Sequence, residues 1–221
     1  MDDPAGTHFL RLFPLESLVL FPGMDLPLIV FEPRYLQLTQ ECVDSGEPFG
    51  VLLLRSGREV GDAESQSHQV GTTAHIQRVS ESNDGRLRVT AVGRDRFRVV
   101  SFIYDRPYLS AHVEYLPDDQ DRQVPNDLLQ RVKEVSTQYV QALLALRGGY
   151  MREVALPDSP EALSYTVAML LQGQQDTQQH LLEVDNTANR LTQESELLRT
   201  ALEEVKERMK QRWSDRGFHR N

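Results

Sequence analysis

Residues 15–35, LESLVLFPGMDLPLIVFEPRY, place two short apolar runs on either side of a Phe-Pro-Gly turn and then open a helix. The runs at 18–21 and 26–31 each have the length and composition of a β-strand. The Pro-Gly pair between them predicts a turn, because proline fixes φ and glycine accepts a positive one. Pro33 suits the first turn of a helix, where its missing N–H costs nothing. The stretch therefore predicts strand, turn, strand and helix in that order.

The region around this stretch, residues 9–116, is β-rich. Five further runs predict strands, and they lie at 49–54, 70–79, 86–92, 96–102 and 109–116. Asn83-Asp84-Gly85 predicts a hairpin turn, and Gly93-Arg94-Asp95 predicts a break between two strands. Many short strands with regular turns indicate a closed or half-closed antiparallel barrel.

After this region the pattern becomes helical. An acidic linker is expected at 117–125, a helical bundle at 126–213 and a flexible tail at 214–221. Within the bundle we expect helices at about 126–147, from Ser159-Pro160-Glu161 onward, at about 176–184 and at about 185–213. The fold class that follows is α+β, with a β-rich barrel first and a long last helix.

The order of these segments resembles that of the N-terminal domain of Lon protease over about residues 9–213. The matching segments are LFPGM at 20–24, the helix after Pro33, VGT at 70–72, the Asp-Gly hairpin, RVTAVGRDRF at 88–97 and PYLSAHV at 107–113. The resemblance implies a pseudo-barrel of the PUA-like type followed by a helical bundle. It also implies that the usual partner is protein rather than a small molecule.

Full Lon proteases continue into an ATPase module and a Ser–Lys peptidase module. This sequence contains no Gly-x-x-x-x-Gly-Lys-Ser/Thr loop to hold a nucleotide. Its lysines, Lys133, Lys206 and Lys210, all fall in predicted amphipathic helices, where a buried Ser–Lys dyad is hard to build. The resemblance therefore implies a stand-alone, non-enzymatic substrate-binding domain with no catalytic residue and no cofactor, which binds protein or unfolded polypeptide.

A barrel of this kind can offer a peptide an apolar groove or a free strand edge. The residues expected to line the peptide-binding groove come from the opening stretch: Phe21, Pro22, Met24 and Tyr35. Core packing is the alternative role for the same side chains.

A second functional hypothesis is anion or RNA binding through arginines on the 86–102 hairpin. Side chains alternate between the two faces of a strand, so Arg86 and Arg88 share a face, as do Arg94, Arg96 and Arg98. A solvated face countered by nearby carboxylates is the alternative, and it is favoured because no aromatic platform is interleaved. A net charge of −9 also argues against general nucleic-acid binding.

The last predicted helix carries apolar residues at spacings of three and four, which is a heptad seam. The seam that could dock on a partner helix or form a homodimer is Leu191, Leu198, Leu202, Val205 and Met209. Packing on the protein's own helices is the favoured alternative.

Composition sets the remaining expectations. No apolar run approaches the ~20 residues that span a bilayer, and the acidic N-terminus does not look like a secretory signal, so we expect a cytoplasmic protein. The single cysteine, Cys42, is expected to be a packing residue and excludes an internal disulfide. The six histidines are not spaced as metal ligands, and Asp118, Asp119 and Asp121 fit a linker better than a calcium loop.

Overall fold

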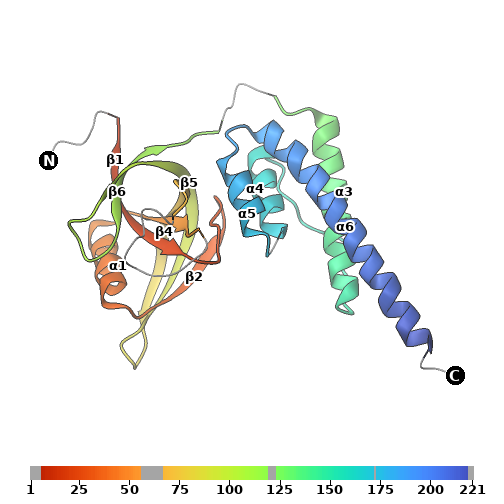
Figure 1. Ribbon diagram of the computed structural model, residues 1–221, viewed down its shortest axis with the longest axis horizontal. Helices are drawn as coiled ribbons and strands as arrows, with labels where there is room; N and C mark the ends of the chain where they lie inside the picture. Colours follow the sequence, from red (N-terminus) through yellow and green to blue (C-terminus); the bar gives the residue numbers. More distant parts are fainter. Residues whose placement is uncertain (1–5, 56–66, 119–122, 172, 219–221) are drawn as a thin grey trace. The chain divides into compact units, whose positions relative to one another are not determined.

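The computed structural model describes residues 6–55, 67–118, 123–171 and 173–218 (Figure 1). The chain forms two compact units. The first comprises Met1–Pro117 together with Gly173–Asp185, and the second comprises Asp118–Gln172 together with Asn186–Asn221. A β-sheet unit combined with helices confirms the expected α+β class.

The first unit contains a six-stranded sheet in the order β2-β5-β4-β3-β1-β6, which an additional β5–β6 pairing closes into a barrel. The strands are β1 (His8–Leu15), β2 (Asp25–Val30), β3 (Phe49–Leu53), β4 (Val70–Glu81), β5 (Leu87–Ile103) and β6 (Ser110–Tyr115). The long β5 pairs with β2 along its first part and with β6 along its last part. Consequently β2 lies outside the closed ring.

Three strand predictions need correction. Residues 18–21 form no strand, because they pair with no described strand, and the turn follows them directly: Met24 N–H donates to the Phe21 carbonyl at 3.1 Å. Residues 8–15, where no strand was expected, form β1, which pairs with β3 in parallel and with β6 antiparallel. The predicted break at Gly93-Arg94-Asp95 is wrong, since β5 runs through it.

One core cluster of the first unit lies between the sheet and helix α1 (Pro33–Ser45), and a second is formed by residues of the strands alone. Leu26 and Val30 of β2 pack in the same buried cluster as Leu38 of α1 and Phe49 of β3. Pro33 opens the helix as expected, and Gly46 ends it in the left-handed conformation at φ 70°. Strand β3 is buried at every position, as its continuous apolar run predicted.

The second unit consists of the helices α3 (Asn126–Leu146), α4 (Pro160–Leu170) and α6 (Thr187–Phe218). The Ser159 hydroxyl caps α4 by accepting from Ala162 N–H at 3.5 Å, as the Ser-Pro-Glu signal predicted. Helix α6 continues to Phe218, so residues 214–218 of the expected tail are helical. Residues 219–221 lie outside the described part of the chain.

The expected helical bundle over 126–213 is wrong for one helix. Helix α5 (Gln175–Glu183) belongs to the first unit, where Gln179 donates from its side-chain amide to the Val70 carbonyl at 3.0 Å. The chain therefore leaves the barrel, builds two helices, returns to the barrel with α5 and then forms α6.

The linker expected at 117–125 is wrong at Asp118, which is buried in the second unit. Its carboxylate accepts from Tyr165 Oη at 2.9 Å and Thr187 Oγ1 at 2.6 Å, and it also pairs with the Arg190 guanidinium. Arg190 itself is fully buried and donates to Ser164 Oγ at 2.9 Å. Residues 119–122, with Asp119 and Asp121, lie outside the described residues.

Candidate polypeptide-binding edge

The turn at residues 21–23 positions strand β2. Gly23 has φ 80°, a conformation that few residues other than glycine adopt, and its N–H donates to the Gly93 carbonyl at 2.8 Å. Gly93 N–H in turn donates to the Met24 carbonyl at 2.9 Å. A Cβ on Gly93 would lie 2.2 Å from the Phe21 carbonyl oxygen, so glycine is needed where the turn crosses β5. Gly93 is therefore a close-contact residue rather than a strand breaker.

Strand β2 has an unpaired main-chain edge. Among the described strands it pairs only with β5. Every second residue of β2 directs its main-chain N–H and C=O toward β5. Because Met24 accepts a hydrogen bond from Gly93 N–H, these residues are Leu26, Leu28 and Val30. The main-chain groups of Asp25, Pro27 and Ile29 face away from β5. Pro27, which has no N–H, falls on the outward side, as expected for proline in an edge strand.

The outer face of β2 exposes apolar side chains. Ile29 is 61% exposed and Phe31, just after the strand, is 62% exposed. Leu26 and Val30, which alternate with them, are buried in the core. A free strand edge beside exposed apolar side chains is the arrangement that binds an extended peptide by strand addition.

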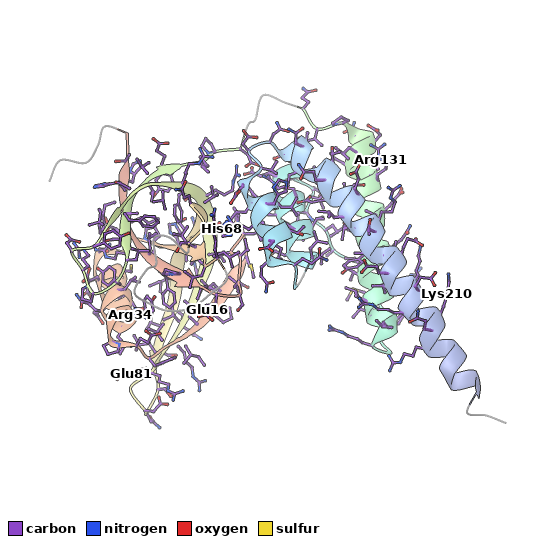
Figure 2. The ribbon with its side chains drawn as sticks, viewed as in Figure 1. Glu16, Arg34, His68, Glu81, Arg131 and Lys210 are labelled. Atoms are coloured by element: carbon purple, nitrogen blue, oxygen red, sulfur yellow. The ribbon has the colours of Figure 1, made fainter. Side chains whose placement is uncertain are left out.

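Arginines lie beside these apolar residues on the outer face. Arg88 of β5 pairs in register with Ile29 on one side and Ser80 on the other, and Thr90 likewise lies between Pro27 and Arg78. The Arg86 guanidinium lies 5.8 Å from the centre of the Phe31 ring. Figure 1 shows the β4–β5 hairpin extending from the barrel, and Glu81, labelled in Figure 2, lies near its tip. We call Pro27, Ile29, Phe31, Arg78, Arg86 and Arg88 the outer β2 face.

The predicted groove residues do not lie together on an open surface. Phe21 is completely buried, so its expected place in a groove is wrong. Met24 and Tyr35 are half-buried and pack against the barrel core, and the Tyr35 ring stacks on Phe13 with centroids 4.1 Å apart. Pro22 is half-buried in the turn. Sequence reasoning missed Ile29 and Phe31, although a proline within an apolar run was a signal for an edge strand.

The five hairpin arginines do not form one surface. Arg96 is 2% exposed, and its Nη1 donates to the carbonyls of Leu182 and Val184 at 2.8 Å each. A guanidinium at the C-terminal end of α5 compensates its unpaired carbonyls. Arg86, Arg88, Arg94 and Arg98 are exposed. The strand alternation could not show that a helix from residues 175–183 covers Arg96.

The apolar seam of α6 is mostly buried within the chain. Leu191, Leu198, Leu202 and Val205 are each at most 5% exposed, and Met209 is half-buried. Within the second unit α6 packs mainly against α3. The seam is therefore covered by the protein's own helices, so these leucines and Val205 are not free to bind a partner helix.

The titratable groups of the described residues form no recognisable reaction centre. No group of three or more His, Cys, Asp or Glu among them could hold a metal ion. Burial raises the pKa of the Cys42 thiol to about 11, opposite to the shift that activates a nucleophilic cysteine. Hydrogen bonds from Tyr108, Gln37 and Arg11 lower the pKa of Glu41 to about 2, which fixes this carboxylate as an ion-pair partner.

Comparison with known proteins agrees with this architecture. A sequence profile described as the "ATP-dependent protease La (LON) substrate-binding domain" matches residues 10–200. The crystal structure of a Lon N-terminal domain protein from Xanthomonas campestris matches this fold with a TM-score of 0.63. The two sequences are 28% identical, and the match covers 84% of this chain and 96% of that one. The N-terminal domain of Mycobacterium avium complex Lon protease shares the fold, with a TM-score of 0.58, 17% identity and coverage of 89% and 98%.

The chain combines a barrel with a helical unit, and the family profile matches residues 10–200 across both. These features define a Lon-type substrate-binding domain. The chain belongs to the LON substrate-binding domain family. The Lon protease of Methylocella silvestris is 28% identical over 91% of this chain, which spans 26% of that relative's length. The chain thus corresponds to about a quarter of the Lon proteases that it matches. Among the described residues, no helix is both long enough and apolar enough to cross a membrane.

Proposed function

We propose that this protein is a non-enzymatic polypeptide-binding module that takes up extended segments at the β2 edge. The observation that carries the proposal is the pairing of an unpaired strand edge with exposed Ile29 and Phe31. The family description supports it, because the matched domain is named for substrate binding. The profile covers the substrate-binding domain rather than the ATPase or peptidase modules, which supports a binding role for this chain.

The interactions available at this edge suit weak and reversible binding. Complete burial of one large apolar side chain contributes about 1.5–3 kcal/mol, and Ile29 and Phe31 are already partly covered in the free protein. Added main-chain hydrogen bonds each contribute about 1 kcal/mol. Ordering an extended peptide opposes both contributions. We therefore expect dissociation constants in the micromolar range or weaker, which suits transient capture of unfolded segments.

Fluorescence anisotropy with a labelled peptide of alternating valine and serine tests the proposal. We expect saturable binding that Ile29→Asp weakens by about tenfold, because a buried charge costs at least ~1.4 kcal/mol. The matched control is Val100→Asp, since Val100 is 49% exposed but lies in the part of β5 that runs beside β6, beyond the residues that pair with β2. Absence of saturable binding, or an equal loss in both variants, would contradict the proposal.

A further inference from the structure

Two of the three arginines of the outer β2 face have no carboxylate partner within the part of the chain that the structure describes. The side chains of Arg78 and Arg88 make no ion pair or hydrogen bond with any described residue. Arg86 pairs with Asp84 at 3.1 Å, and that contact is exposed on both sides. The other carboxylate that shares this face is Asp25, at the start of β2. Local positive charge therefore exceeds negative charge here, although the chain as a whole carries −9.

Arg86 and Arg88 lie within reach of a segment that adds to β2. Neighbouring strands are ~4.8 Å apart, so an added strand would lie ~10 Å from β5. Arg88 lies on β5 in the same register row as Ile29, and its side chain is long enough to span most of that distance. Arg86 already lies over the Phe31 ring. Apolar side chains of a bound segment would contact Ile29 and Phe31, and carboxylates beside them would meet guanidinium groups.

We propose that the outer β2 face selects extended polypeptide segments whose apolar centre is flanked by acidic side chains, with Arg86 and Arg88 as specificity-determining residues. This inference rests on the proposed function and adds the chemistry of the preferred segment. Charge complementarity is the reason, because unpaired guanidinium groups favour carboxylates and disfavour lysine or arginine on the bound segment.

Two other occupants fit the same face less well. A second copy of this chain, paired through β2, would bring two sets of these arginines together, and Pro27 leaves a gap in its hydrogen-bond donors. Single-stranded RNA needs a series of aromatic rings for its bases, whereas this face offers one, Phe31, with Arg86 beside it. The apolar pair Ile29 and Phe31 contributes little to binding a phosphate backbone.

The test uses three labelled peptides with the same apolar centre and with aspartate, serine or lysine at the flanks. Anisotropy titrations are made on the full chain at low and high salt, with oligouridine as the nucleic-acid probe. We expect the aspartate peptide to bind about three- to tenfold more tightly than the lysine peptide. This preference should shrink at high salt, where exposed charges are screened.

Arginine variants locate the preference. Arg88→Gln should reduce the ratio of the lysine-peptide to the aspartate-peptide dissociation constant, because it removes the guanidinium charge nearest to the flanks of the bound segment. Arg98→Gln is the matched control, since Arg98 is exposed where β5 has partners on both sides. Circular dichroism confirms that each variant folds.

Each contrary outcome has a distinct meaning. If none of the three peptides binds, the proposed function fails. If all three bind with equal affinity, or if Arg98→Gln removes the preference as strongly as Arg88→Gln, only the inference on acidic flanks fails. The inference on acidic flanks is overturned in favour of nucleic acid under one further outcome. In that outcome oligouridine binds more tightly than the aspartate peptide, and Arg88→Gln weakens the oligouridine binding.

Discussion

Two arginines, one from each unit of this protein, have opposite roles. In the helical unit, Arg190 is fully buried and held by Asp118, Ser164 and the face of Tyr165. On the barrel, the Arg88 side chain is exposed and makes no ion pair or hydrogen bond within the described residues. The first arrangement fixes the positions of two helices and a chain segment. The second leaves a charge available for another molecule.

The two arginines differ in how much folding stability depends on their charged partners. A buried ion pair is expensive to form and still more expensive to break, because the remaining partner keeps its desolvation cost. An exposed arginine can be removed with little effect on stability, so we expect its placement beside Ile29 and Phe31 to act on the proposed recognition rather than on folding. Stability should therefore depend on the helical cluster, and binding on the outer β2 face.

The largest expected effect is loss of the buried pair. Asp118→Ala should lower the free energy of unfolding by about 3–5 kcal/mol, since it leaves the Arg190 charge buried without its carboxylate. Urea unfolding monitored by circular dichroism measures the change. Asp158→Ala is the control, because Asp158 forms an exposed ion pair with Lys133, and its midpoint should stay unchanged. Equal midpoints for both variants would contradict the structural role of Asp118.

The second-largest loss of stability is expected at Gly93, where the turn at residues 21–23 crosses β5. Gly93→Ala places a Cβ 2.2 Å from the Phe21 carbonyl oxygen, so the turn must move, and we expect a loss of about 1–3 kcal/mol. Gly149→Ala is a matched control, because its nearest contact would be an ordinary 3.4 Å. Thermal denaturation of both variants measures the difference. A Gly93 variant as stable as the Gly149 variant would show that the turn does not rest on β5 in this way.

Glu194 of α6 should make stability depend on pH. Its carboxyl is buried and neither oxygen has a hydrogen-bond partner among the described residues, so burial raises its pKa well above the ordinary value, partly opposed by Arg190. The folded protein then keeps this proton while the unfolded chain loses it. The contribution of Glu194 is complete below the ordinary glutamate pKa of about 4.3 and falls by at most ~1.4 kcal/mol per pH unit above it.

Urea titrations at several pH values measure this slope. Glu194→Gln should flatten the slope between mildly acidic and neutral pH, and the exposed neighbour variant Glu196→Gln should not. An unchanged slope in Glu194→Gln would mean that the carboxyl is ionised in the folded protein.

The smallest expected effect concerns Cys42 of α1. Its side chain is 2% exposed, and burial raises its pKa to about 11, so it should resist alkylation by iodoacetamide at pH 8 in the native state and react in urea. Mass spectrometry of the labelled protein measures the difference. Rapid labelling under native conditions would contradict the packing of α1 on the barrel.

Sequence patterns predicted most elements but not the residues that long-range contacts decide. The strands at 26–31, 49–54 and 70–79 and the helix after Pro33 were predicted because periodicity and turn residues are local signals. Arg96 was misread because α5, more than eighty residues later, covers it. No local signal marks Glu194 as buried, yet packing of the helical unit buries it.

The candidate site shows the same limit. Phe21 was expected to line a groove, but the turn rests on Gly93 and Phe21 is buried in the core. Whether Ile29 is exposed depends on which strand pairs with β2, and pairing is a property of the whole sheet. The resemblance to Lon N-terminal domains predicted the architecture, whereas the binding edge required the structure.

Residue-resolved amide hydrogen exchange by NMR, with and without saturating peptide, tests the central claim most directly. The Ile29 N–H faces away from β5, so it should exchange rapidly in the free protein and become protected when a peptide adds to the edge. The Leu28 N–H, which faces β5, should be protected in both states. Saturated binding that leaves Ile29 exchange unchanged would contradict peptide addition at β2.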